Sequence, residues 1–239
     1  MSEGEAKTNP LWVGLHAARA NVLPGLVVQA LMVALVAGYY FYRPSAALLE
    51  GLSKLRAEIG LPFAVMSTVV AGSVLPELFK VVFFQGGKAT RGNLRTLGLT
   101  AILWGCQGIV VDVLYRLQSY WFGDAMNFQT VATKVALDQF VFNPLFAGIV
   151  NTLWYHLLVV GFTWENVRRG LTWDFYRRNV IPVLIATWGV WVPIVTAVYL
   201  LPQPLQFPLF TLALTFWAIL LAWIGHAQVK RAGGAVKQS

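Results

Sequence analysis

The sequence predicts an all-α, polytopic membrane protein, and three observations lead to this fold class. Of the 239 residues, 57% are hydrophobic and only 12% are charged, whereas a soluble domain carries about 25% charged residues. The apolar residues fall into runs of about twenty, the length that an α-helix needs to cross roughly 30 Å of hydrocarbon. Tyr and Trp gather at several ends of these runs, as they do at membrane interfaces. We therefore expect a bundle of transmembrane helices.

Run length predicts about six membrane segments. They are residues 22–42, 62–84, 94–115, 131–161, 180–201 and 207–226. The fourth segment is long and contains Asn143 and Pro144, and because Pro removes a backbone donor we expect that helix to be tilted, kinked or broken. Leucines at helical spacing within residues 44–60 predict a short surface helix between the first two segments.

The basic residues predict the orientation in the membrane. Twelve Lys and Arg residues lie on the side that holds both termini and five on the opposite side, so the positive-inside rule places both termini in the cytoplasm or its organellar equivalent. Glu3 and Glu5 argue against an acid-poor transit peptide, and we expect the first segment to be retained as an anchor. The host membrane would be a bacterial plasma membrane or an organellar membrane.

Several function classes find no support in the sequence. The net charge of +8 is not arranged as a basic and aromatic loop, so nucleic acid is not an expected partner. The single Cys106 allows no internal disulfide, and His16, His156 and His226 lack metal-ligand spacing. No nucleophile motif, phosphate loop or dinucleotide fingerprint is present. We therefore expect no enzyme activity, no cofactor and no metal.

Ionisable side chains inside the predicted membrane segments are the candidate functional residues, because each costs at least about 2.5 kcal/mol to insert without a partner. Three oppositely charged pairs lie at helical spacing: Glu77 with Lys80, Asp112 with Arg116, and Lys134 with Asp138. Gln139 and Asn143 extend the polar face of the fourth segment. Two interpretations stay open: these groups line a hydrated pathway, or they join helices in a dry network.

A basic segment at residues 163–179 is the second candidate region. Its arginines are Arg168, Arg169, Arg177 and Arg178, and they alternate with apolar and aromatic residues. This pattern is typical of an interfacial amphipathic helix that contacts anionic lipids or a protein partner, although an ordinary basic loop also fits. Small residues such as Gly98 and Gly105 suit a homo-oligomer, or packing within one chain.

The fourth and later segments resemble the Mpv-seventeen family, named also for the twenty-two-kilodalton peroxisomal membrane protein. The similar stretches are KVALDQFVFNP, which contains Lys134, Asp138, Gln139 and Pro144, then WGVWVPIVTAVYLLP at 188–202 and WAILLAW at 217–223. The family's paired Trp-Pro is interrupted here by Val192. The resemblance is strongest over residues 134–223.

The resemblance implies a division of the chain and a function. Residues 1–61 would form an N-terminal extension with one membrane helix and a surface loop, residues 62–227 the family-like bundle, and residues 228–239 a basic tail. Members of the family occur in peroxisomal and inner mitochondrial membranes, and some are proposed to be weakly selective channels. The expected function is therefore a weakly selective small-solute channel or a membrane-homeostasis protein. The alternative is a membrane scaffold that transports nothing.

Overall fold

A computed structural model describes residues 10–236, and within that range it contains helices and connecting loops without a strand. The elements in chain order are α2 (Pro10–Phe41), α3 (Arg43–Ile59), α4 (Leu61–Val69), η1 (Val70–Val74), α5 (Leu75–Phe84), α6 (Arg91–Phe122), α7 (Phe128–Leu137), η2 (Asp138–Ala147), α8 (Gly148–Val160), α9 (Trp164–Gly170), α10 (Trp173–Phe175), η3 (Tyr176–Val180), α11 (Ile181–Tyr199) and α12 (Gln203–Val236). The η segments are π-helical turns between α-helices. The predicted all-α fold class is confirmed.

Four of the predicted membrane segments are present as long apolar helices. They are Leu61–Phe84, Arg91–Phe122, Phe128–Val160 and Trp173–Tyr199. Many of their apolar side chains face outward, including Phe83, Leu145 and Val159, as lipid contact requires. The sixth predicted segment lies within α12, but its residues 220–226 have side chains outside the described part of the chain. The protein is an integral membrane protein that contacts the lipid bilayer.

The first predicted segment differs from a simple span. The part of α2 from Gly25 to Phe41 meets α3 at an angle of 101°. The two helices are long and apolar enough for a membrane segment only when taken together, and they then form either a broken span or a re-entrant loop. Tyr42 is extended and Pro44 lies in the first turn of α3, and since Pro has no backbone donor it starts helices rather than continuing them. Residues 44–60, predicted as a loop with a short helix, are helical almost throughout.

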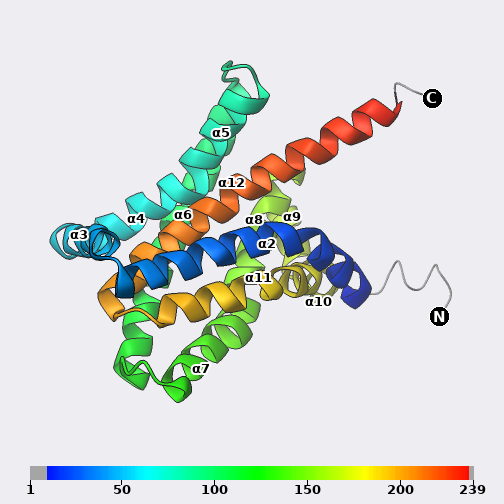
Figure 1. The fold of residues 1–239 in the computed structure, drawn as a ribbon. Coiled ribbons are helices and arrows are strands. Elements are labelled where there is room, and N and C mark those ends of the chain that lie inside the picture. The colour runs from blue at the N-terminus through cyan, green and yellow to red at the C-terminus, as the bar shows by residue number, and fades with distance from the viewer. Residues whose placement is uncertain (1–9, 237–239) are drawn as a thin grey trace.

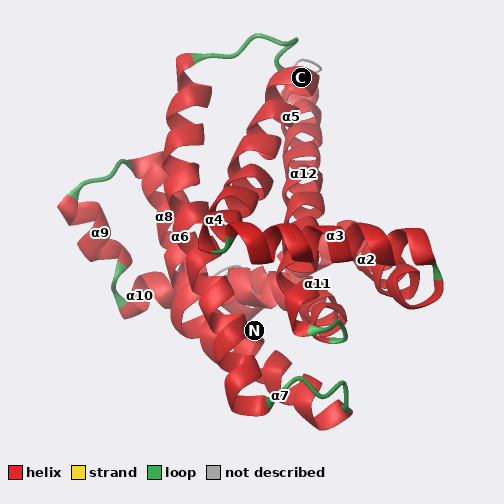
Figure 2. Ribbon diagram, turned by 90° about the vertical axis from the view of Figure 1, so that its left-hand side faces the viewer, coloured by secondary structure: helices red, strands yellow, loops and turns green. Residues whose placement is uncertain are grey.

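The connections between helices fall into two groups (Figure 1). The α2–α3–α4 corner lies at the left and the α6–α7 loop and the α11–α12 turn at the lower left, whereas the α5–α6 loop lies at the top and the far end of α12 at the upper right. Figure 2 shows α3 lying across the bundle and α9 at the end of α8. This alternation is what an up-and-down membrane bundle requires.

Two helix pairs approach each other closely because glycines face the contact. In the α2–α11 pair, a Cβ on Gly25 would lie 2.5 Å from Val190, and Gln29 Nε2 donates to the Gly189 carbonyl at 2.8 Å. In the α4–α6 pair, a Cβ on Gly108 would lie 2.2 Å from the Thr68 hydroxyl. Small residues allow such backbone proximity in membranes.

Gly98 and Gly105, predicted to serve either a homo-oligomer or packing within one chain, differ in their surroundings. Gly105 packs within the chain, since a Cβ there would lie 3.5 Å from Val65 and Val69. At Gly98 a Cβ would meet nothing within 4 Å. A homo-oligomer stays a prediction.

The predicted interruption at Asn143 and Pro144 is confirmed as the ten-residue π-helical segment η2. Pro144 cannot donate to the helix ladder, and a wider turn accommodates it without ending the helix. The Pro144 carbonyl accepts a hydrogen bond from the Tyr176 hydroxyl at 3.3 Å. The result is one long helix, α7–η2–α8, whose middle turns its polar residues toward the bundle interior.

Candidate functional site

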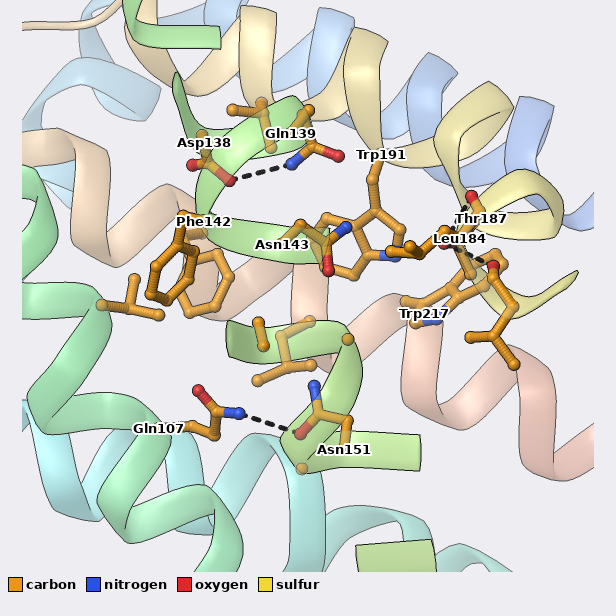
Figure 3. A pocket seen from close by; sticks show the side chains of 18 of the residues that line it. Gln107, Asp138, Gln139, Phe142, Asn143, Asn151, Leu184, Thr187, Trp191 and Trp217 are labelled. Carbon is orange, nitrogen blue, oxygen red and sulfur yellow. Dashed lines mark hydrogen bonds between the residues drawn. The ribbon is translucent and has the colours of Figure 1, made fainter. Parts of the chain in front are cut away.

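A cavity of about 910 Å³ lies inside the bundle, between α4–η1–α5, α6, η2–α8, α11 and α12. Figure 3 shows Asp138 and Gln139 on one wall, the Gln107 and Asn151 pair on the opposite one, and Asn143 between them. The other labelled lining residues are Phe142, Leu184, Thr187, Trp191 and Trp217. The sequence-predicted residues Asp138, Gln139 and Asn143 thus share one cavity.

Asp138 is held by neutral donors. Its Oδ1 accepts from Gln139 Nε2 at 2.9 Å and its Oδ2 from the Tyr199 hydroxyl at 2.8 Å. Gln118 Nε2 donates in turn to the Tyr199 hydroxyl at 2.8 Å. The side chain is 8% exposed, and no Lys, Arg or His nitrogen of the described residues lies within 4.0 Å of its carboxylate.

The predicted pairing of Lys134 with Asp138 is wrong. Lys134 Nζ instead lies 3.0 Å from the carboxylate of Asp124, in the loop before α7, and 5.9 Å from the centre of the Tyr199 ring. Its side chain is 2% exposed. The long Lys side chain runs back toward the helix N-terminus, the direction in which helical side chains lean, and reaches the interface side.

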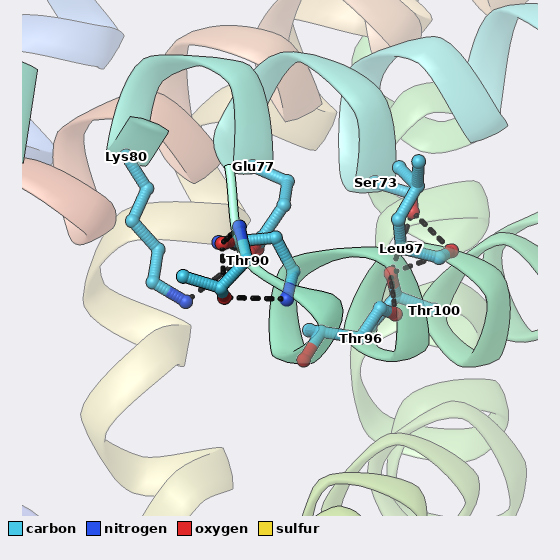
Figure 4. Close-up of polar contacts among 8 residues, drawn as sticks. Ser73, Glu77, Lys80, Thr90, Thr96, Leu97 and Thr100 are labelled. Carbon is cyan, nitrogen blue, oxygen red and sulfur yellow. Dashed lines mark hydrogen bonds and ion pairs between the residues drawn. The ribbon is translucent and has the colours of Figure 1, made fainter. Parts of the chain in front are cut away.

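Glu77 and Lys80, which were predicted to line a pathway or to join helices, are not among the residues that line the cavity. They pair with each other at 3.2 Å, and Asn93 Nδ2 donates to Glu77 at 2.5 Å. Figure 4 shows this cluster beside the start of α6, with Thr90 next to it. The Lys80 side chain is 44% exposed. The cluster joins α5 to the N-terminus of α6.

Polar groups on other helices complete the cavity, and they were not among the predicted site residues. Gln107 Nε2 donates to Asn151 Oδ1 at 2.9 Å. Two of the residues that line the cavity, Gln139 and Thr152, each have a buried oxygen, Oε1 and Oγ1, without a hydrogen-bond partner. An amide such as Gln107 inside an apolar run was the available signal, because a buried amide requires a partner.

A buried ion cluster joins α3 to α6. Asp112 pairs with Arg116 at 2.8 Å, as its spacing predicted, and also with Arg56 of α3. The Arg56 guanidinium lies 5.2 Å from the centre of the Phe207 ring and donates to the Pro204 carbonyl at 3.3 Å. Arg56 is 6% exposed. Its burial was not predicted, because its partner lies 56 residues away.

The basic segment forms the short helix α9, then α10 and η3, rather than one amphipathic helix. Arg169 pairs with Glu165 at 2.5 Å, and Asp174 pairs with Arg178 at 2.8 Å and with Arg177 at 3.7 Å. The exposed side chains around these pairs are Trp164, Arg168, Leu171 and Trp173. The segment presents aromatic and cationic groups together, as interfacial segments do.

Comparison with known proteins gives one distant relative. Protein SYM1 of Mycosarcoma maydis is 30% identical over 147 residues, which cover 55% of this chain. The chain spans 65% of that relative's length. No protein-family model matches the chain, and no solved structure matches it. The similarity therefore covers the larger part of this chain.

Proposed function

We propose that this chain belongs to the Mpv-seventeen family and forms a pathway for small solutes, with the cavity as its widest part. The motif at residues 134–144 supports the family, as does the similarity to Protein SYM1, a member of the same family. The cavity supports the pathway. Its 910 Å³ falls within the roughly 300–1,000 Å³ of small-molecule sites.

The single observation that carries the proposal is the polar end of this cavity. A buried oxygen without a partner loses about 1–3 kcal/mol relative to one that is hydrogen-bonded. Gln139 and Thr152 line the same space, and Gln139 Oε1 and Thr152 Oγ1 have no protein partner, so water or a solute in the cavity would satisfy both once the side chains turn toward it. A dry network that served only to join helices would leave this cost uncompensated.

Efflux of radiolabelled sorbitol from liposomes that contain the purified chain tests the pathway. Ala147→Phe would fill part of the cavity, which Ala147 lines, and should lower the efflux. Leu145→Phe is the matched control, because Leu145 is 69% exposed on the outer face of the same π-helical segment. If the protein is folded and sorbitol leaves these liposomes no faster than empty ones, the proposed pathway is wrong.

The alternative function is a scaffold that holds anionic lipid through the segment at residues 164–180. The exposed tryptophans beside its arginines favour this, since each arginine near an anionic surface contributes about 1 kcal/mol. A variant with Gln at all four arginines should lose co-purified anionic lipid, as measured by mass spectrometry of the extracted lipids. Unchanged lipid content would exclude this function.

A further inference from the structure

The charge inside the cavity has one sign. Asp138 is the one residue with a formal charge among the described residues that line the cavity, and no Lys, Arg or His is among them. Two buried cations of the bundle have other partners: Lys134 pairs with Asp124, and Arg56 pairs with Asp112. The cavity therefore presents a carboxylate that no protein cation neutralises by contact.

The same wall has surplus hydrogen-bond acceptors. Each oxygen of Asp138 accepts one hydrogen bond from the protein, and a carboxylate oxygen can accept two. Gln139 is 4% exposed, and its Oε1 accepts none. Both Asp138 oxygens can thus accept a further hydrogen bond from a ligand. A donor-rich group fits this wall, whereas an anionic group would meet like charge.

Aromatic rings form another wall of the same cavity. Trp191 and Trp217 lie with ring centres 6.2 Å apart and nearly perpendicular, and Phe210 lies 6.3 Å from Trp191. All three line the cavity, and Figure 3 shows the two tryptophans on the side away from Phe142. Tryptophan rings offer large apolar faces that stack on the aromatic or apolar part of a ligand.

We propose that the cavity binds small organic ammonium cations. The ammonium group lies at Asp138 and Gln139, and the apolar part of the ligand lies against Trp191 and Trp217. This inference rests on the proposed function, since it names the solute class for the same cavity. It excludes anionic solutes such as phosphates and sulfonates as preferred ligands.

Binding is tested with two probes of similar size and opposite charge, benzylammonium and benzenesulfonate. Equilibrium dialysis of each radiolabelled probe against the full chain in lipid nanodiscs, corrected with empty nanodiscs, measures binding without requiring transport. We expect the cation to bind and benzenesulfonate not to bind. Asp138→Asn should weaken binding of the cation about tenfold, because it removes the charge and keeps the shape. Glu58→Gln, an exposed carboxylate change on α3, should leave binding unchanged.

Trp191→Leu is a second variant that leaves the hydrogen bonds of Asp138 in place. It should weaken binding of the cation severalfold through loss of the ring face that packs on the apolar part of the ligand, so the test holds even if Asp138→Asn does not fold. Equal binding of both probes, or cation binding that neither variant weakens, overturns the inference. If the cation binds but sorbitol does not leave the liposomes, the proposed pathway is wrong and the ammonium site stands. If sorbitol leaves the liposomes but the cation binds no better than benzenesulfonate, the ammonium site is wrong and the pathway stands.

Discussion

At the scale of single residues, the buried charges of this protein divide into a compensated and an uncompensated set. Asp112 contacts two arginines, Arg56 and Arg116. Asp138 contacts only neutral donors. Burying a charge without a partner of opposite charge costs free energy. The arginines offset this cost for Asp112, whereas for Asp138 a bound cation or a proton on the carboxylate would offset it.

We predict that Arg56→Met destabilises the protein by about 3–5 kcal/mol, because Asp112 would keep only the partly exposed Arg116 as partner. Thermal unfolding in detergent measures the change. Lys54→Met, an exposed site on the same helix, is the control. The double variant Arg56→Met with Asp112→Leu should recover most of the loss, since no unpaired charge remains. A double variant as unstable as Arg56→Met would contradict the assignment of the cost to Asp112.

At the scale of helices, the walls of the cavity include the closely packed α4–α6 pair and the π-helical segment η2. The α4–α6 contact at Gly108 is tight, and the Thr68 hydroxyl donates to the Trp104 carbonyl across it at 2.8 Å. The π-helical segment η2 on the facing helix carries Asp138, Gln139 and Asn143. Single π-turns are frequent at functional sites because they rotate side chains out of the regular helical register.

Gly108→Ala should lower stability by about 1–3 kcal/mol, because the added methyl would lie 2.5 Å from the Ala64 carbonyl oxygen, a backbone atom that cannot move away easily. Gly98→Ala on the same helix is the matched control. Nothing lies within 4 Å of its added methyl, so stability should stay unchanged or rise slightly. Equal melting temperatures for the two variants would show that α4 and α6 are not packed as described.

At the scale of the whole molecule, the loops form two groups at opposite ends of the bundle (Figure 1). The positive-inside prediction assigns the group with the α5–α6 loop to the cytoplasmic side and the group with the α6–α7 loop to the other side. The exposed residues Ala89 and Ala125 lie in these two loops.

Cysteine labelling tests this orientation, because Cys106 is the single native cysteine and can be replaced by Ser. In spheroplasts of a bacterial host, a membrane-impermeant maleimide should label Ala125→Cys directly and Ala89→Cys only after permeabilisation. The reverse pattern would invert the predicted topology.

Access of water to the cavity is tested in the same Cys106→Ser background. A charged methanethiosulfonate reagent should modify Asn143→Cys, which lines the cavity, and should not modify Ile102→Cys, which is 56% exposed on the apolar outer surface of α6. Protection of both positions would mean that the cavity is closed to water from either side.

Composition and run length were enough to predict the class of the protein, most of its membrane helices and the polar face of the fourth helix. Run length and hydrophobicity are local properties, and the bilayer translates them directly into spanning helices. The same reasoning located the interruption at Pro144 and the Asp112 pair with Arg116, whose partners lie one helical turn apart.

The polar groups that meet across helices could be identified only from the way the helices pack in three dimensions. Arg56 reaches Asp112 from 56 residues away, and Tyr199 reaches Asp138 from 61 residues away. Lys134 turns from the expected Asp138 to a loop residue, which leaves the carboxylate to the cavity. Such contacts depend on how the helices pack. In a membrane, the shapes of the side chains on both helices set how two helices align, and no pattern along one segment contains that information.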